Sequence, residues 1–208
     1  MKPKGSPAPQ TISADTADAL MAMLAMSGSY APDAVGVDCI HPQRTITIVL
    51  AHQLTATVAA RLAVVPDIAY VKYLNDLPID DPRREAQLVD KFVAEAAHHG
   101  VPAQLARGVI CAQLEAAKHV QYELFFQWLS GTRLLPDRPV RALADMRSEI
   151  DAATDLLSLQ LAAAYRGSLP SDWSQQLEIA ARQARPEAND EVTTASFNEA
   201  LAPLKHMA

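Results

Sequence analysis

The chain has 208 residues, of which 50% are apolar and only 5% aromatic, with seven glycines. This length suits one domain with a substantial core, and an Ala- and Leu-rich, Gly-poor composition favours helices over strands. The net charge of −6 is carried by scattered rather than clustered basic residues, which argues against a nucleic-acid-binding face.

Residues 1–43 are predicted to form a flexible leader, because five prolines with Gly and Ser between them do not support packed structure. Within the leader, the apolar run 19–26 and a small-x-small motif ending at Ala31 are typical of a signal peptide. However, Asp15 and Asp18 stand where positive charge is expected. The residues therefore leave open whether the leader directs export.

Residues 44–208 are predicted to form one all-α domain, a bundle of about six helices whose first, third and fourth members are long. The expected helices run from about Thr45 to Asn75, Pro82 to His99, Pro102 to Ser130, Pro139 to Gly167, Ser171 to Ala184 and Asp190 to Leu204. Pro66 removes one backbone donor inside the first helix. Because the apolar stripe stays in phase across Pro66, we expect a kink rather than a break.

The apolar stripe of the first helix contains two long cations, Arg61 and Lys72. Its other members are apolar: Leu54, Val58, Val65 and Ile68. Eleven residues are about three helical turns, so the two charges share one face roughly 16 Å apart. A cation on an inward face is costly unless it meets an anion. Since no carboxylate lies on this stripe, the anion could be a ligand.

Three further stripes repeat this irregularity, with Arg84, Gln121 and Arg147 among otherwise apolar residues. A bundle of these helices would bring Arg61, Lys72, Arg84, Gln121 and Arg147 to one place. A single such arginine more often extends to the surface or pairs with a neighbouring acid. Four cations and one amide on four stripes favour a buried anion site instead.

The remaining motifs predict structure rather than chemistry. Asp81 is expected to cap the second helix, with Pro82 at its first position and Glu85 close to a capping-box position. His98-His99 at a helix end lacks a third ligand at metal spacing, so no metal site is expected. Cys39 and Cys111 are expected to be free thiols, although a disulfide between them is possible.

No phosphate-binding loop, nucleophile elbow or zinc-protease motif is present in the sequence. No membrane span is predicted, because His52, Arg61 or Asp67 interrupts the longest apolar stretches. An enzyme of this kind would need chemistry that positioning and charge alone can drive.

The order of these residues resembles the all-helical chorismate mutases. The resemblance rests on Arg61, on Lys72 eleven residues later, on the Leu77-Pro78-Ile79-Asp80-Asp81-Pro82-Arg83-Arg84-Glu85 block, and on Gln113-Leu114-Glu115-Ala116-Ala117-Lys118-His119-Val120-Gln121-Tyr122. The exported, monofunctional gamma subclass is the most similar, because its distinctive late arginine matches Arg147 in Met146-Arg147-Ser148-Glu149-Ile150-Asp151. The resemblance covers roughly residues 45–205.

This resemblance implies the rearrangement of chorismate to prephenate without metal or cofactor. Arg61 and Arg147 would hold substrate carboxylates, and Arg84 would contact the ring and the breaking ether. Lys72 and Gln121 would donate to the ether oxygen. The substrate hydroxyl would meet Asp81 and Glu85.

The resemblance also implies a homodimer and a periplasmic or secreted location, with the cytoplasm as the alternative if the leader is no signal peptide. Ala117 replaces a hydroxyl residue of many relatives, so one substrate hydrogen bond would be missing or supplied by backbone. Two other functions stay open: a pyruvate lyase of the same fold acting on isochorismate, and a non-catalytic helical binding module.

Overall fold

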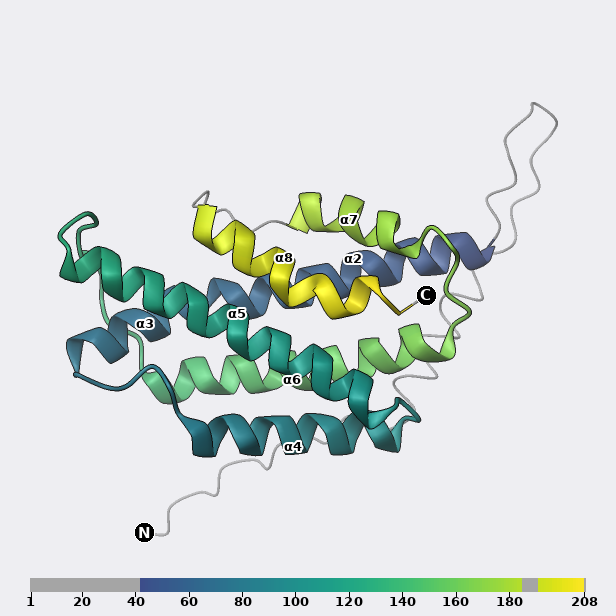
Figure 1. Ribbon diagram of the computed structural model, residues 1–208, viewed down its shortest axis with the longest axis horizontal. Coiled ribbons are helices and arrows are strands. Elements are labelled where there is room, and N and C mark those ends of the chain that lie inside the picture. The colour runs from purple at the N-terminus through teal and green to yellow at the C-terminus, as the bar shows by residue number, and fades with distance from the viewer. Residues whose placement is uncertain (1–41, 185–190, 208) are drawn as a thin grey trace, which may run out of the picture. The chain divides into compact units, whose positions relative to one another are not determined.

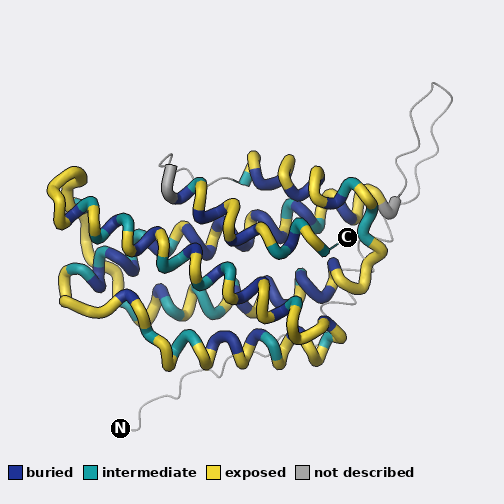
Figure 2. Tube along the Cα trace, viewed as in Figure 1, coloured by how far each residue is buried: buried dark blue, intermediate teal, exposed yellow. Residues whose placement is uncertain are grey.

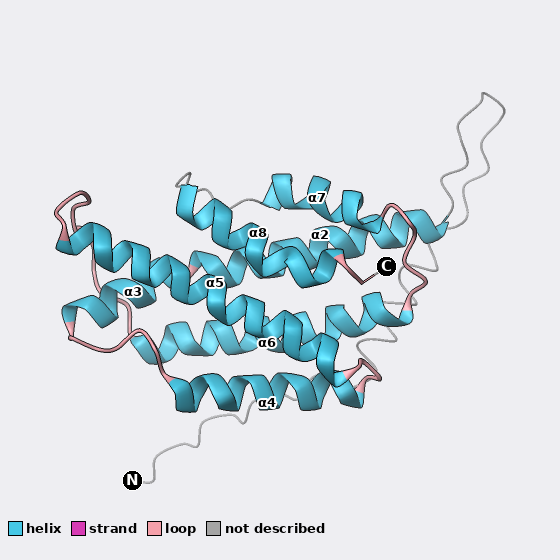
Figure 3. Ribbon diagram, in the orientation of Figure 1, coloured by secondary structure: helices cyan, strands magenta, loops and turns pink. Residues whose placement is uncertain are grey.

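The computed structural model describes residues 42–184 and 191–207, which lie within one compact unit of residues 40–208. All regular structure in these residues is helical (Figure 3). The helices are α2 (Pro42–Ala63), α3 (Val65–Leu74), α4 (Pro82–His98), α5 (Ala103–Leu129), α6 (Leu143–Arg166), α7 (Trp173–Ala184) and α8 (Glu191–Lys205). The all-helical fold predicted from the sequence is therefore confirmed. The predicted leader lies outside the described residues except for Pro42 and Gln43, which begin α2.

Pro66 divides the long first helix into α2 and α3 at Val64. The backbone of Val64 keeps helical angles (φ −82°, ψ −21°), so the two segments join without a loop. The amide of Asp67 donates to the carbonyl of Val64 at 3.2 Å. The chain thus makes a tightened turn where Pro66 cannot donate to the carbonyl of Leu62, and the interruption is a kink.

Left-handed glycines mark the ends of α4 and α5, as the sequence predicted. Gly100 has φ +84° and Gly131 has φ +72°, a conformation that costs glycine little and other residues more. In contrast, α6 begins at Leu143, four residues after the start predicted at Pro139. Arg138 and Arg141, which lie just before α6, both pair with Asp67 of α3, so this stretch is tied to α3 before α6 begins.

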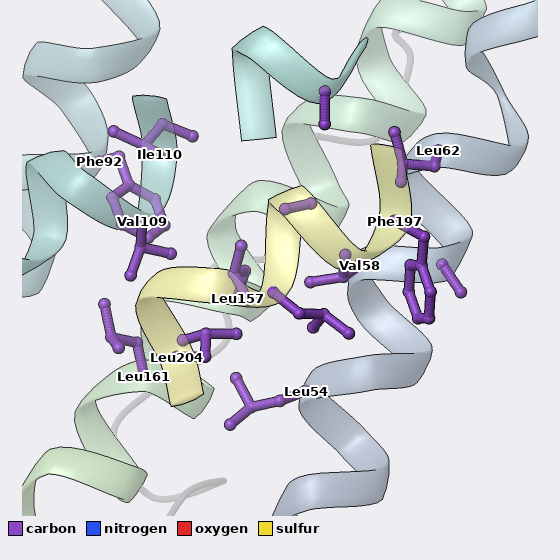
Figure 4. Close-up of a cluster of buried hydrophobic side chains, with 14 of the residues drawn as sticks. Leu54, Val58, Leu62, Phe92, Val109, Ile110, Leu157, Leu161, Phe197 and Leu204 are labelled. Carbon is purple, nitrogen blue, oxygen red and sulfur yellow. The ribbon is translucent and has the colours of Figure 1, made fainter. Parts of the chain in front are cut away.

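The helices pack as a bundle in which α5 lies along α4 and α8, while α2 lies along α6 and α7 (Figure 1). The buried faces point inward along each helix (Figure 2). Figure 4 shows Phe197 and Leu204 of α8 among Leu54 of α2 and Leu161 of α6 in the main core cluster. This core contains most of the buried apolar side chains, and α7 and α8 complete it.

The segment Arg44–Leu74 is long and apolar enough to cross a membrane by length and composition, a criterion that a buried core helix also meets. Half of its most apolar stretch is buried inside the bundle. Leu54, Val58 and Leu62 are at most 1% exposed, which is the packing of a core helix.

Candidate active site

Arg61 is a buried cation, and no carboxylate of the described residues lies within ion-pair distance of it. It is 5% exposed, and its Nη1 donates to the hydroxyl of Thr154 and, at 3.2 Å, to the carbonyl oxygen of Ile150. Its Nε is buried without a hydrogen-bond partner. Burial lowers the pKa of Arg61 to about 10, which leaves the guanidinium charged at neutral pH. Arg61 therefore has unused capacity to bind an anion.

Lys72 is the second buried cation, 7% exposed on α3. Its Nζ donates to the carbonyl oxygen of Ile79 at 2.6 Å, which ties the connector before α4 to α3. Burial and the positive charge of Arg147 lower the pKa of Lys72, and Asp81 and nearby acids oppose this shift only in part. Its remaining two N–H groups can serve a ligand.

Arg84 and Arg147 are half-buried, and each one pairs with a carboxylate. Nη2 of Arg84 lies 2.9 Å from Oδ1 of Asp151, and Nη2 of Arg147 lies 3.1 Å from Oδ2 of Asp81. Neither ion pair was predicted from the sequence, although Asp81 was expected at the site, so the expectation of cations without protein partners was wrong for Arg84 and Arg147. We refer to Arg61, Lys72, Arg84 and Arg147 as the cation cluster.

Asp81 joins the start of α4 to the cation cluster. Its Oδ1 accepts from the backbone amide of Arg84 at 3.2 Å, which confirms the predicted N-cap. The backbone amide of Asp81 donates in return to Oε1 of Glu85 at 3.1 Å, the reciprocal bond of a capping box displaced by one residue. Because its other oxygen pairs with Arg147, one side chain fixes both the helix end and a cation.

Gln121 is 6% exposed on α5, and its Nε2 donates to the carbonyl oxygen of Ala117 at 3.1 Å. The amide keeps a second N–H for a ligand, while its Oε1 is buried without a hydrogen-bond partner. No contact in the described structure joins Gln121 directly to the cation cluster. Its proximity to Lys72 therefore stays a prediction.

A cavity of about 330 Å³ opens where the 77–83 connector faces α3 and α6. Lys72, Asp81 and Arg147 contribute to its wall. Arg61, Arg84 and Gln121 do not line this cavity. The volume lies within the range of small-molecule sites, roughly 300–1,000 Å³.

The inward face of α6 connects the cavity to the other two cations. Asp151, the partner of Arg84, lies one turn beyond Arg147, and Thr154, a partner of Arg61, lies two turns beyond it. Arg61 of α2 and Arg84 of α4 thus both contact one stripe of α6.

An outer network braces the connector against α5. Nζ of Lys118 lies 3.4 Å from Oε2 of Glu85 and 3.9 Å from Oδ1 of Asp80. The hydroxyl of Tyr122 donates to Asp80 as well. This network holds the start of α4 in the position where Asp81 reaches Arg147.

The fold and this site define a class: a helical bundle whose centre contains cations and an amide that can bind an organic anion. Among the residues with described side chains, no three His, Cys, Asp or Glu gather in an arrangement that could hold a metal ion. The cations and amides present can bind carboxylates and stabilise developing negative charge.

Comparison with known proteins shows which proteins this chain is similar to. Residues 49–122 match the family model of chorismate mutase type II. A "Secreted chorismate mutase" of Yersinia pestis is 28% identical over 58% of this chain, and a "Monofunctional chorismate mutase" of Enterobacter agglomerans is 31% identical over 47% of it. A crystal structure of a chorismate mutase from Burkholderia thailandensis superposes with a TM-score of 0.68 at 28% identity, covering 76% of this chain and 99% of that one.

The chain is therefore similar to the all-helical chorismate mutases, in sequence over residues 49–122 and in fold over most of the bundle. The matched regions span 63% and 52% of the two curated relatives' own lengths. The family model ends at residue 122, so it contains Arg61, Lys72, Arg84 and Gln121 but not Arg147.

Proposed function

We propose that this protein is a chorismate mutase, which converts chorismate to prephenate by an intramolecular rearrangement. The observation that carries the proposal is the buried guanidinium of Arg61, which lacks a carboxylate partner within a segment that matches the family model. Asp151 only partly offsets the burial of Arg61, so an anion in direct contact with the guanidinium would offset more of its desolvation cost. Chorismate is a dicarboxylate and can supply that anion.

We assign the roles of the site residues as the resemblance to chorismate mutases implies, and the charges of the cluster support this assignment. Arg61 and Arg147 bind the two substrate carboxylates, because a planar guanidinium can contact two oxygens and stays charged. Arg84 contacts the ring near the ether that breaks. Asp81 and Glu85 meet the substrate hydroxyl, with Asp81 using its backbone.

Catalysis then comes from positioning and charge. The substrate is held in a compact conformation in which the ether C–O bond breaks as a C–C bond forms, so no proton or electron leaves the molecule. Negative charge grows on the ether oxygen in the transition state, where Lys72 and Gln121 donate hydrogen bonds. Loss of one such donor typically costs roughly 3–4 kcal/mol of barrier.

We also propose that the protein is exported and forms a homodimer. The name of the Yersinia pestis relative supports export, and the leader carries a signal-like apolar run. Fusion of residues 1–43 to a reporter that is active only outside the cytoplasm tests the first point. Sedimentation of the purified chain tests the second.

The test of the proposed activity is to separate the products that the full-length chain forms from chorismate and, in a parallel reaction, from isochorismate. Prephenate from chorismate is the expected result. Pyruvate from isochorismate would keep the fold and change the reaction to that of a lyase.

Arg61→Ala distinguishes an enzyme from a non-catalytic binding module. We expect this variant to lose at least about a thousandfold in kcat/KM while its melting temperature changes little. Thr154 still donates to Ile150 at 2.6 Å, so its hydroxyl keeps a partner when Arg61 is removed. A large loss of stability with unchanged turnover would show that Arg61 is structural.

A further inference from the structure

Two ion pairs link α4 to α6, one turn apart on α6. Arg84 pairs with Asp151 at 2.9 Å, and Lys91 pairs with Asp155 at 2.6 Å. The first pair is the inner one, with side chains 33% and 40% exposed, and the second is 55% and 53% exposed. The same kind of contact thus occurs once beside the cation cluster and once on the surface.

Asp151 also faces the deepest cation of the cluster. Arg61 reaches the carbonyl of Ile150 and the hydroxyl of Thr154, which lie on either side of Asp151 along α6. The carboxylate of Asp151 is the charge that opposes the effect of burial on the pKa of Arg61. One acid therefore serves two cations that come from different helices.

We infer that Asp151 is a positioning residue for the proposed reaction: its carboxylate fixes the guanidinium of Arg84 where that group meets the substrate. The inference rests on the proposed function and adds a residue to it. Asp151 uses one nitrogen of Arg84, Nη2, and leaves the other N–H groups of the guanidinium for the substrate. Arg84 makes no other side-chain ion pair in the described structure.

The reason is conformational. An arginine side chain has several rotatable bonds, and a half-exposed one is free to turn toward solvent unless a partner holds it. The Asp151 contact removes this freedom before the substrate binds. A small displacement of a group near the reacting bond can cost about a hundredfold in rate.

The test compares Asp151→Asn with Asp155→Asn in the full-length chain, using kcat and KM for chorismate per mole of folded protein. Both variants remove one carboxylate from an α4–α6 ion pair on the same helix. We expect Asp151→Asn to lower kcat at least about tenfold without raising KM, because the variant also removes a negative charge that repels the substrate. Asp155→Asn is expected to stay within about twofold of the wild type.

Two further variants separate positioning from a structural role. In an Arg84→Ala background, Asp151→Asn is expected to lower kcat by less than about twofold more, because Asp151 acts through Arg84. Asp151→Glu is expected to recover part of the lost rate. Loss of either half-exposed ion pair, by Asp151→Asn or Asp155→Asn, should lower the melting temperature by a similar small amount.

A fall in kcat of less than about tenfold for Asp151→Asn would overturn the inference. So would a fall in kcat in the Arg84→Ala background as large as the fall that Asp151→Asn causes in the wild type. In both cases an active wild-type chain would still uphold the proposed function. An inactive but folded wild-type chain would instead overturn the proposed function and this inference with it.

Discussion

The apolar core and the cation cluster are built on the same helices, yet burial of their side chains has opposite effects on stability. On α2, Leu54 and Val58 are fully buried in the core, and Arg61 follows less than one turn after Val58. On α6, Leu157 lies in the core, whereas Asp151 lies among the cations. Within two turns, the apolar side chains of a helix stabilise the fold by their burial, whereas its charged side chains cost free energy unless a ligand binds.

This contrast shows how such a site is supported. The core gains apolar burial from α7 and α8, which contact α2 and α5. The site itself gains little from burial, because charged groups lose hydration there. We therefore expect substitutions in the two regions to separate stability from activity.

The largest expected effect is that of Lys72→Met, which keeps the length of the side chain and removes its charge. We expect kcat to fall at least about a thousandfold, because the donor to the ether oxygen is lost. The melting temperature should stay the same or rise, since burial disfavours the charged lysine in the fold. Initial rates and thermal unfolding measure the two effects.

The pH dependence of stability provides a control for Lys72. The pKa of Lys72 is lowered in the folded state from its ordinary 10.5. Between the folded-state pKa and 10.5, the unfolded chain therefore binds more protons at Lys72 than the folded chain does. Its contribution to stability therefore rises with pH toward 10.5 and falls as pH decreases through the folded-state pKa. Lys72→Met should lack this contribution, and an identical pH profile of unfolding in both proteins would contradict it.

In the core, Phe197→Ala should show the reverse pattern. Phe197 is 1% exposed, and truncation of such a side chain costs about 3–5 kcal/mol of unfolding free energy. The kcat of the folded fraction should stay within about twofold of the wild type. The matched control is Ile179→Ala, because Ile179 is 49% exposed and should change stability by less than about 0.5 kcal/mol. Urea unfolding measures both.

A smaller and pH-dependent effect is expected for Gln121→Glu. A neutral amide donates at any pH, so we expect wild-type kcat/KM to be flat between about pH 5 and 8. A glutamic acid must be protonated to donate, so the activity of the variant relative to wild type should fall as pH rises through this range. A constant ratio across the range would contradict the role assigned to Gln121.

The sequence predicted the helices well because their signals are local. The capping Asp81, the first-turn Pro82 and the terminal Gly100 define α4 within a residue. The start of α6 was missed by four residues, because long-range pairs of Arg138 and Arg141 with Asp67 hold the preceding stretch. Local patterns do not contain such contacts.

The same limit applies to the site. Burial of Arg61, Lys72 and Gln121 could be predicted from their helical spacing. The partners of Arg84 and Arg147 could not, because Asp151 and Asp81 lie 67 and 66 residues away along the chain. Spacing rules relate residues three or four apart on one helix, and only packing shows which acids meet which cations.

The central claim is that the cation cluster and Gln121 suffice for catalysis by positioning and charge. The most direct measurement is the rate of prephenate formation from chorismate by the full-length chain in chelator-treated buffer. The account predicts turnover whose rate does not change when metal ions are removed or restored. A folded chain that leaves chorismate unchanged, or that needs a metal ion to convert it, would contradict the account.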